Sequence, residues 1–263
     1  MPRSRTGAKQ TEMRITGSAK STQGHVALVT GGTSGIGLAL VEALHARGAV
    51  VCFCARNAKS IAALQSRLPG TKGYVCDVTV ASALTSMANE IENVERKLDV
   101  LIANAGAMHQ LDFAKAPLAE SSIRYEIDLN LTSAMLTVNA FLPLLMRSPA
   151  PHIVFMGSGY GWSPAGSAPP YSAAKAGLRA FVKSLRAQLR SSDVHVMEVV
   201  PPAVDTPGAV PGSGRRIAPS DIAQVTLRGI DRGLPTVFAG QTRLLPFMLR
   251  IAPGALERMT LRA

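Results

Sequence analysis

The sequence predicts an α/β protein in which a parallel sheet is covered by helices on both faces. Short apolar runs alternate along the chain with longer stretches in which apolar residues recur every three or four positions. This alternation is the pattern of strand–helix–strand units. Each apolar run is continuous rather than interrupted at every second position, as expected of strands buried on both faces.

Seven apolar runs are the expected strands. They cover residues 25–30, 49–54, 73–77, 98–104, 152–157, 194–200 and 235–240. The first helix follows a glycine-rich turn and should end at Gly48, because glycine is the commonest residue just past a helix. Asn57 should cap the second helix with its side-chain oxygen. Longer helices are expected over residues 80–95, 122–146 and 171–190.

The composition fits one large domain. The chain has 263 residues, of which 47% are hydrophobic and 17% charged, enough apolar residues for a sizeable core. No internal repeat or linker divides it. We expect a disordered basic tail over residues 1–22, one nucleotide-binding and catalytic domain over 23–240, and a C-terminal helical extension over 241–263.

The net charge of +11 raises the question of an anionic partner, because basic residues gather near both ends. Nucleic acid and an anionic membrane are two readings, and a solvated tail on a protein that binds anionic cofactors is the third. No aromatic residues are interleaved with the N-terminal basic residues, so a platform for stacked bases is not supported. We therefore expect no nucleic-acid partner.

The C-terminal stretch from Leu244 is apolar with spaced arginines. It could lie at a membrane surface, contact a second subunit, or cover the substrate pocket. Pro246 and Pro253 divide it into short pieces, so peripheral membrane contact is not favoured.

Cysteine usage and the N-terminus suggest a cytoplasmic protein. Cys52, Cys54 and Cys76 fall in expected buried strands, and an odd number of cysteines is typical of free thiols in a reducing compartment. No apolar run reaches the length of a membrane span, and the first 22 residues lack the apolar core of a secretory signal. Their basic residues, serines and threonines also fit an organellar transit peptide, but a disordered tail is favoured.

Tyr171 and Lys175 are the first candidate catalytic pair. They lie four residues apart in an expected helix, and so on the same face. An ammonium beside a phenol favours the phenolate, so Lys175 should lower the pKa of Tyr171 and make it an acid or base near neutral pH. Ser158 precedes Tyr171 by thirteen residues. The hydrolase pattern G-x-S-x-G fails at Ser158 and at Ser163.

The turn Gly31-Gly-Thr-Ser-Gly-Ile-Gly lies between an expected strand and an expected helix. Its glycines allow a tight turn and a close approach to a pyrophosphate, and the N-terminus of the helix favours negative charge. The turn therefore predicts a nucleotide cofactor.

Together these motifs resemble the classical short-chain dehydrogenase/reductase family over residues 24–240. The glycine turn, Asn104-Ala-Gly, Ser158 and Tyr171-Ser-Ala-Ala-Lys175 occur in the family's order. The Pro-Pro-Ala-Val-Asp-Thr segment at 201–206 is similar to the subgroup related to the D-alanylation-operon oxidoreductase. The resemblance implies a single-domain Rossmann fold, with a doubly wound sheet of seven parallel strands.

The resemblance also implies the chemistry. Members transfer a hydride reversibly between a nicotinamide and a carbonyl or secondary alcohol. Tyr171 would be the acid or base, Lys175 would lower its pKa and hold the ribose, and Ser158 would orient the substrate oxygen. Asn130 would distort its helix and hold a water that links Lys175 to solvent.

Cofactor choice depends on the end of the second strand, where Arg56 follows directly and no carboxylate is present. This predicts NADP(H), with NAD(H) as the alternative. The positions that match the family's cofactor contacts are Gly31, Thr33, Ser34, Gly35, Ile36, Gly37, Arg56, Asp77, Val78, Asn104, Ala105, Gly106, Tyr171, Lys175, Pro201, Val204 and Thr206.

Candidate substrate-contacting residues are Met108, His109, Tyr160 and Trp162, with the loop 205–220. This mixture suggests a moderately hydrophobic carbonyl or alcohol. Arg215 and Arg216 could meet an anionic substrate, but are expected to be surface charges. No metal site is expected.

The resemblance implies a homodimer or homotetramer formed through the helices that carry Asn130 and Tyr171. Small residues at Ala173, Ala176, Gly177 and Ala180 would allow close packing there. The alternatives to an enzyme are a non-catalytic NADP(H)-binding sensor or scaffold, and a nucleic-acid-associated protein recruited by its basic ends.

Overall fold

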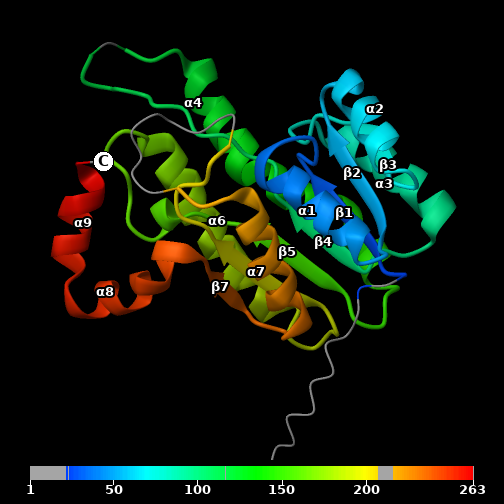
Figure 1. The fold of residues 1–263 in the computed structure, drawn as a ribbon. Helices are drawn as coiled ribbons and strands as arrows, with labels where there is room; N and C mark the ends of the chain where they lie inside the picture. Colours follow the sequence, from blue (N-terminus) through cyan, green and yellow to red (C-terminus); the bar gives the residue numbers. More distant parts are fainter. Residues whose placement is uncertain (1–21, 23, 116, 207–215, 263) are drawn as a thin grey trace, which may run out of the picture.

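The computed structural model describes residue 22 and residues 24–115, 117–206 and 216–262. Within them seven parallel strands form one sheet in the order β3-β2-β1-β4-β5-β6-β7 (Figure 1). The strands are β1 Val26–Thr30, β2 Val50–Ala55, β3 Lys72–Val75, β4 Val100–Ala103, β5 His152–Met156, β6 His195–Val200 and β7 Thr236–Phe238. The predicted fold class is therefore confirmed.

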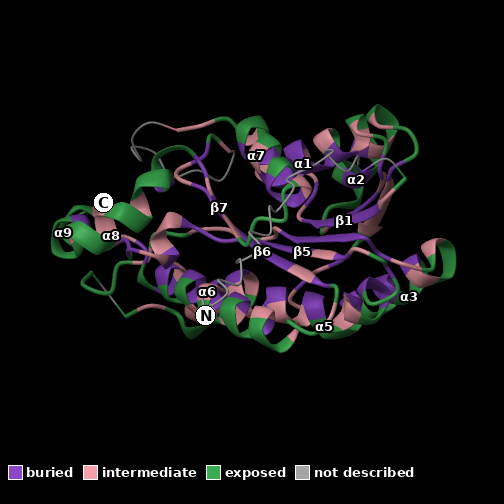
Figure 2. Cartoon of the chain, turned by 90° about the horizontal axis from the view of Figure 1, so that it is seen from below, coloured by how far each residue is buried: buried purple, intermediate pink, exposed green. Residues whose placement is uncertain are grey.

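Helices cover both faces of the sheet (Figure 2). The longer ones are α1 Gly35–Ala46, α2 Ala58–Arg67, α3 Ala81–Glu95, α4 Glu120–Ile127, α5 Ser133–Leu145, α6 Pro169–Gln188 and α7 Pro219–Asp231. One hydrophobic layer joins the sheet to α3, α5 and α6, and the other joins it to α1, α2 and α7. All five residues of β1 are buried, which explains why its sequence, Val-Ala-Leu-Val-Thr, is almost entirely apolar.

The topology fixes where a ligand can bind. β1 pairs with β2 on one side and with β4 on the other, so the strand order reverses at β1. Ligands of open α/β sheets bind at such a reversal, outside the carboxyl ends of the strands. The turn after β1 and the segments after β4 and β5 all lie at this edge.

The helix predicted over 122–146 is present, and it is distorted at Asn130, as the family resemblance implied. Between α4 and α5 the chain forms a π-helical segment, η1, over Asp128–Thr132. A π segment widens a helix by one residue per turn and is frequently found at functional sites. By length and mean hydropathy the whole stretch, Glu120–Leu145, could cross a membrane, but α5 packs its buried face on the sheet as a core helix of the domain.

Helix α7 is absent from the elements predicted by sequence. Pro219 stands at its start, where proline is favoured, and Ile222, Leu227 and Ile230 face the core. These features are typical of a helix, but the Gly- and Pro-rich stretch before them is typical of a loop and hides the start of the helix. The cap predicted for the second helix is confirmed, because the Asn57 side chain accepts a hydrogen bond from the Ser60 backbone N–H.

Residues 207–215, Arg215 among them, and all but Thr22 and Gly24 of the stretch before His25 lie outside the described residues. The predictions of a disordered tail and of the central part of the 205–220 loop fall there. After β7 the chain forms the short helices η3 Gly240–Leu244, α8 Leu245–Ile251 and α9 Pro253–Leu261.

Candidate active site

The glycine-rich turn is shaped by close backbone contacts. A Cβ on Gly37 would lie 2.0 Å from the Gly31 carbonyl oxygen, and Gly31 and Gly35 have φ angles of +67° and +52°. Among the described residues no side chain caps α1, and its first turn holds no acidic residue. Its N–H groups and positive helix end are therefore free to bind an anion, so the turn fits the pyrophosphate of a nucleotide cofactor.

Asn104 joins the turn to the end of β4. Its Nδ2 donates to the Thr30 carbonyl oxygen at 2.9 Å, and its backbone N–H donates to the Thr30 hydroxyl at 3.0 Å. The backbone N–H of Ala105 donates to the same hydroxyl. Thr206 approaches the turn from the other side, since a Cβ on Gly35 would lie 3.0 Å from its methyl group.

Arg56 lies at the carboxyl end of β2, beside the turn, because the Gly32 N–H donates to the Cys54 carbonyl oxygen. Its guanidinium is exposed and donates to the Tyr125 hydroxyl at 3.2 Å. Asp77 follows β3, and one of its carboxylate oxygens accepts hydrogen bonds from Thr79. Partial burial opposes ionisation of Asp77, but the bonds from Thr79 lower its pKa overall.

Tyr171, Lys175 and Ser158 come together at the carboxyl end of β5. Tyr171 lies in the first turn of α6, Lys175 one turn further on, and Ser158 caps the short helix η2 Gly159–Gly161. The Lys175 Nζ is 5.7 Å from the centre of the Tyr171 ring and donates to the Met156 carbonyl oxygen at 2.9 Å. The described residues thus bring a phenol, an ammonium and a hydroxyl to one point.

The expected lowering of the pKa of Tyr171 is wrong for the protein alone. Burial raises the pKa of Tyr171 to about 12, despite the opposing hydrogen bond with Ser158, and the charge of Glu126 adds to the rise. Burial also lowers the pKa of Lys175 to about 8, because its side chain is 5% exposed. Desolvation outweighs the attraction between the two groups on which the sequence argument relied.

Asn130 completes the group from η1. Its Nδ2 donates to the Ala107 carbonyl oxygen at 2.8 Å, whereas its Oδ1 is buried and has no partner among the described residues. A Cβ on Gly106 would lie 2.8 Å from this Oδ1 and 3.4 Å from the Lys175 Nζ. The absence of that side chain leaves both polar atoms facing one small space, which suits a bridging water.

Glu126, a residue that the sequence analysis missed, lies beside Asn130. Its side chain is 1% exposed, and it accepts a hydrogen bond from Asn130 Nδ2 at 3.0 Å. The His109 backbone N–H donates to the same carboxylate at 3.0 Å, and the His109 ring nitrogen Nδ1 also contacts it. The sequence offered one signal, since Glu126 precedes Asn130 by one helical turn.

The four predicted substrate-contacting residues do not form one group. Tyr160 lies two residues after Ser158 and donates its backbone N–H to the Ser158 hydroxyl at 3.2 Å. Met108 is half-buried in the segment after β4. The His109 ring is bound to Glu126 rather than free for substrate. The Trp162 side chain is occupied by other residues: its Nε1 donates to Glu198 of β6 at 3.3 Å, and its ring stacks on Arg179 of α6.

The C-terminal helices lie next to the loop between β5 and α6. The Thr260 hydroxyl of α9 is 2.8 Å from that of Ser163, and the Gly166 N–H donates to the Thr260 carbonyl oxygen. On α8 and just before it, Leu244, Phe247 and Ile251 are exposed. The extension is therefore tied to the loop that leads to Tyr171.

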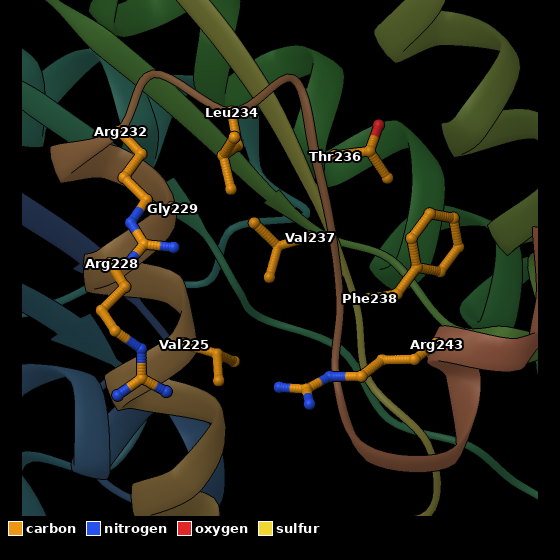
Figure 3. A pocket seen from close by; sticks show the side chains of 9 residues that line it. All are labelled: Val225, Arg228, Gly229, Arg232, Leu234, Thr236, Val237, Phe238 and Arg243. Carbon is orange, nitrogen blue, oxygen red and sulfur yellow. The ribbon is translucent and has the colours of Figure 1, made fainter. Parts of the chain in front are cut away.

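A hollow of about 330 Å³ lies between α7 and β7, outside this group (Figure 3). Arg228 extends from α7, Arg232 follows the end of this helix, and Arg243 reaches toward the hollow from η3. Val225 and Val237 form part of its apolar lining. It is a basic surface that shares no lining residue with the cluster around Tyr171.

A doubly wound sheet with a glycine turn at its reversal, and a Ser–Tyr–Lys group beside it, defines an NAD(P)-dependent oxidoreductase. Residues 25–213 match the sequence profile described as short chain dehydrogenase. The chain belongs to the short-chain dehydrogenase family, as the motifs predicted.

Three relatives place the chain within the family. It is 36% identical over 179 residues to an uncharacterized oxidoreductase, DltE, of Bacillus subtilis, covering 68% of this chain and 71% of the relative. It is 32% identical over 185 residues to the 3-oxoacyl-[acyl-carrier-protein] reductase FabG of Escherichia coli, covering 70% and 75%. A crystal structure of a short chain dehydrogenase from Burkholderia cenocepacia J2315 in complex with NADP has a TM-score of 0.82 at 26% identity, covering 92% and 99%.

Proposed function

We propose that this protein is an NADP(H)-dependent carbonyl reductase in which Tyr171 donates a proton to the substrate oxygen. The observation that carries the proposal is the convergence of Ser158, Tyr171, Lys175 and Asn130 next to a glycine turn that can hold a pyrophosphate. A non-catalytic sensor would need the turn but would not need a buried lysine beside a phenol.

NADP(H), when bound, supplies the hydride at C4 of its nicotinamide, and the protein supplies position and protons. The Ser158 hydroxyl would hold the substrate oxygen within reach of the Tyr171 hydroxyl. Tyr171 would give up its proton as the oxygen becomes an alcohol. Lys175, which shares with Asn130 Oδ1 a space that would fit a water, would return a proton to Tyr171 from that side.

NADP(H) is proposed over NAD(H) because of Arg56. Its guanidinium lies at the end of β2, where a ribose 2′-phosphate would be bound, and no carboxylate of β2 stands there. The structural relative in complex with NADP supports the same choice. The reductive direction is supported by the name of the Escherichia coli relative, a 3-oxoacyl reductase.

Two further features belong to the proposal. Ala173, Ala176 and Ala180 are exposed along α6 and would let a second copy of this helix approach closely, in a dimer or tetramer. The buried, unpaired thiols of Cys52, Cys54 and Cys76 suit a reducing cytoplasm. Burial raises the pKa of the Cys52 thiol to about 12, which makes it unreactive.

The test is a fluorescence titration of the purified protein with NADPH and with NADH. It is followed by a panel of ketones, aldehydes and 3-oxoacyl thioesters, read by loss of reduced-cofactor absorbance. We expect tighter binding of NADPH and turnover of at least one carbonyl. Binding without turnover of any carbonyl would favour the sensor alternative, and binding of neither cofactor would refute the proposal.

A further inference from the structure

Glu126 is a fully buried carboxylate beside the proposed proton path. Its side chain is 1% exposed, although it lies on α4 near the surface-exposed His109, whose side chain is 54% exposed. An isolated carboxylate at such a position would be strongly disfavoured by desolvation. The groups that surround the Glu126 carboxylate must therefore offset the cost of its desolvation.

The close polar partners of Glu126 are two N–H donors and the ring nitrogen of His109. The Asn130 amide nitrogen donates to Oε2, and the His109 backbone N–H donates to Oε1, which the His109 ring also contacts. A carboxylate offers only acceptors, whereas a glutamine of the same shape would offer one acceptor and one NH₂ group. The site therefore selects an acid, rather than any polar side chain.

Three acceptors fix which way the Asn130 amide faces, and Glu126 supplies two of them. Nδ2 donates to Glu126 Oε2, to the Glu126 backbone oxygen at 3.1 Å and to the Ala107 oxygen at 2.8 Å. With the nitrogen held by these acceptors, Oδ1 must point the other way, toward the space over Gly106 that it shares with the Lys175 Nζ. Reversal of the amide would set its NH₂ group against the ammonium and its oxygen against the carboxylate.

Glu126 also acts on the charges of α6. Its negative charge raises the pKa of Lys175, opposing desolvation, and also raises the pKa of Tyr171. The other titratable groups that act on this pair are Glu198 of β6, which acts on Lys175, and Tyr160 of η2, which acts on Tyr171. Asp128, in η1, is exposed.

We propose that Glu126, held by His109, is a positioning residue of the active site that orients the Asn130 amide toward Lys175 and balances the charge of the buried ammonium. This inference rests on the proposed function for its effect on turnover, but its effect on Tyr171 can be measured without turnover. His109, predicted to contact substrate, instead joins this carboxylate to solvent.

The test compares the wild-type protein with Glu126→Gln, Glu126→Asp and the matched control Glu120→Gln. Glu120 lies on the same helix, is exposed, and pairs with Arg124 at 2.5 Å. Two quantities are measured for each folded variant. One is the ionisation of Tyr171 by NMR of ¹³Cζ-labelled tyrosine, assigned with Tyr171→Phe, and the other is the pH profile of NADPH-dependent carbonyl reduction.

Glu126→Gln should move the Tyr171 ionisation and the alkaline limb of kcat to lower pH, each by ~1 unit. It should also lower kcat by ~10-fold with little change in KM, because a side chain that is 1% exposed is closed to direct contact with a substrate. Glu126→Asp keeps the charge but shortens the side chain. The value of kcat should therefore fall, while the pH of the Tyr171 ionisation and of the alkaline limb of kcat should stay unchanged. Glu120→Gln should match wild type.

The inference is overturned if Glu126→Gln leaves the Tyr171 ionisation in place, or if Glu120→Gln moves it equally. If Glu126→Gln does not fold, Glu126→Asp decides, since an unchanged kcat would contradict a positioning role. If wild type binds NADPH but reduces no carbonyl, the proposed function fails while the tyrosine titration still tests Glu126.

Discussion

The glycine turn and the cluster around Tyr171 lie at the same edge of the sheet, but they depend on different physical properties. The turn is defined by backbone, with a Cβ at Gly37 excluded by an oxygen 2.0 Å away. The cluster is defined by buried polar side chains, among them Lys175, Asn130 and Glu126. Changes of shape should therefore disable the first region, and changes of protonation should disable the second.

The largest effect is expected in the cluster. Tyr171→Phe removes the proposed proton donor without changing the shape of the helix, so kcat for carbonyl reduction should fall by ~10³-fold. NADPH affinity, measured by fluorescence titration, should stay close to that of wild type. The matched control is Tyr74→Phe, a half-buried tyrosine on β3, which should retain turnover. A Tyr171→Phe protein with full turnover would show that the proton comes from elsewhere.

The next effect is expected in the turn. The added methyl group of Gly37→Ala would lie 2.6 Å from the Asn104 amide and closer still to Gly31. Overpacking of 1–3 kcal/mol should weaken NADPH binding by ~10- to 100-fold, or unfold the protein. Gly254→Ala in α9 is the control, because its nearest neighbour is the end of the flexible Arg258 side chain at 3.7 Å. Unchanged cofactor affinity in Gly37→Ala would mean that the pyrophosphate is bound elsewhere.

A smaller effect separates the two cofactors. Arg56→Ala should weaken NADPH binding by ~10-fold and leave NADH binding nearly unchanged, since only NADPH carries the 2′-phosphate. Arg67→Ala, which removes an exposed guanidinium paired with Glu42, should change neither affinity. Equal losses for both cofactors in Arg56→Ala would argue against 2′-phosphate recognition.

The smallest effect concerns Lys175, whose replacement by an apolar residue should raise stability although it removes activity. Burial lowers the folded-state pKa of Lys175 from 10.5 to about 8. The unfolded chain therefore binds the Lys175 proton more tightly than the folded protein does. Below pH 8 the folded protein carries the full free-energy cost of burying the ammonium. This cost disappears as the pH rises toward 10.5. Lys175→Met should abolish turnover but raise the Tm at pH 7 by ~2–4 °C.

The lysine prediction is checked by thermal unfolding at pH 7 and pH 10. The gain in Tm over wild type should shrink at the higher pH, where wild-type Lys175 is neutral. A loss of Tm at pH 7 would mean that the hydrogen bond from Lys175 to Met156 outweighs desolvation of the ammonium.

Much of the fold and the motif residues could be predicted, because strands buried on both faces and a glycine turn leave clear local patterns. Helix α7 was missed because a Gly- and Pro-rich stretch masked its start at Pro219. The pKa of Tyr171 was predicted in the wrong direction, because burial is a tertiary property that the spacing of Tyr171 and Lys175 does not contain. Glu126 and Trp162 show the same limit, since His109 contacts Glu126 from another segment and Glu198, on β6, is 36 residues from Trp162.

Hydride transfer itself is tested with NADPH that carries deuterium at both C4 positions, by mass spectrometry of the alcohol formed from a carbonyl substrate. We expect one deuterium on the carbinol carbon with wild type, and a rate that nearly vanishes in Tyr171→Phe although the cofactor still binds. NADPH binding with no deuterium delivered to any carbonyl of the panel, or equal transfer by the two proteins, would contradict the proposed mechanism.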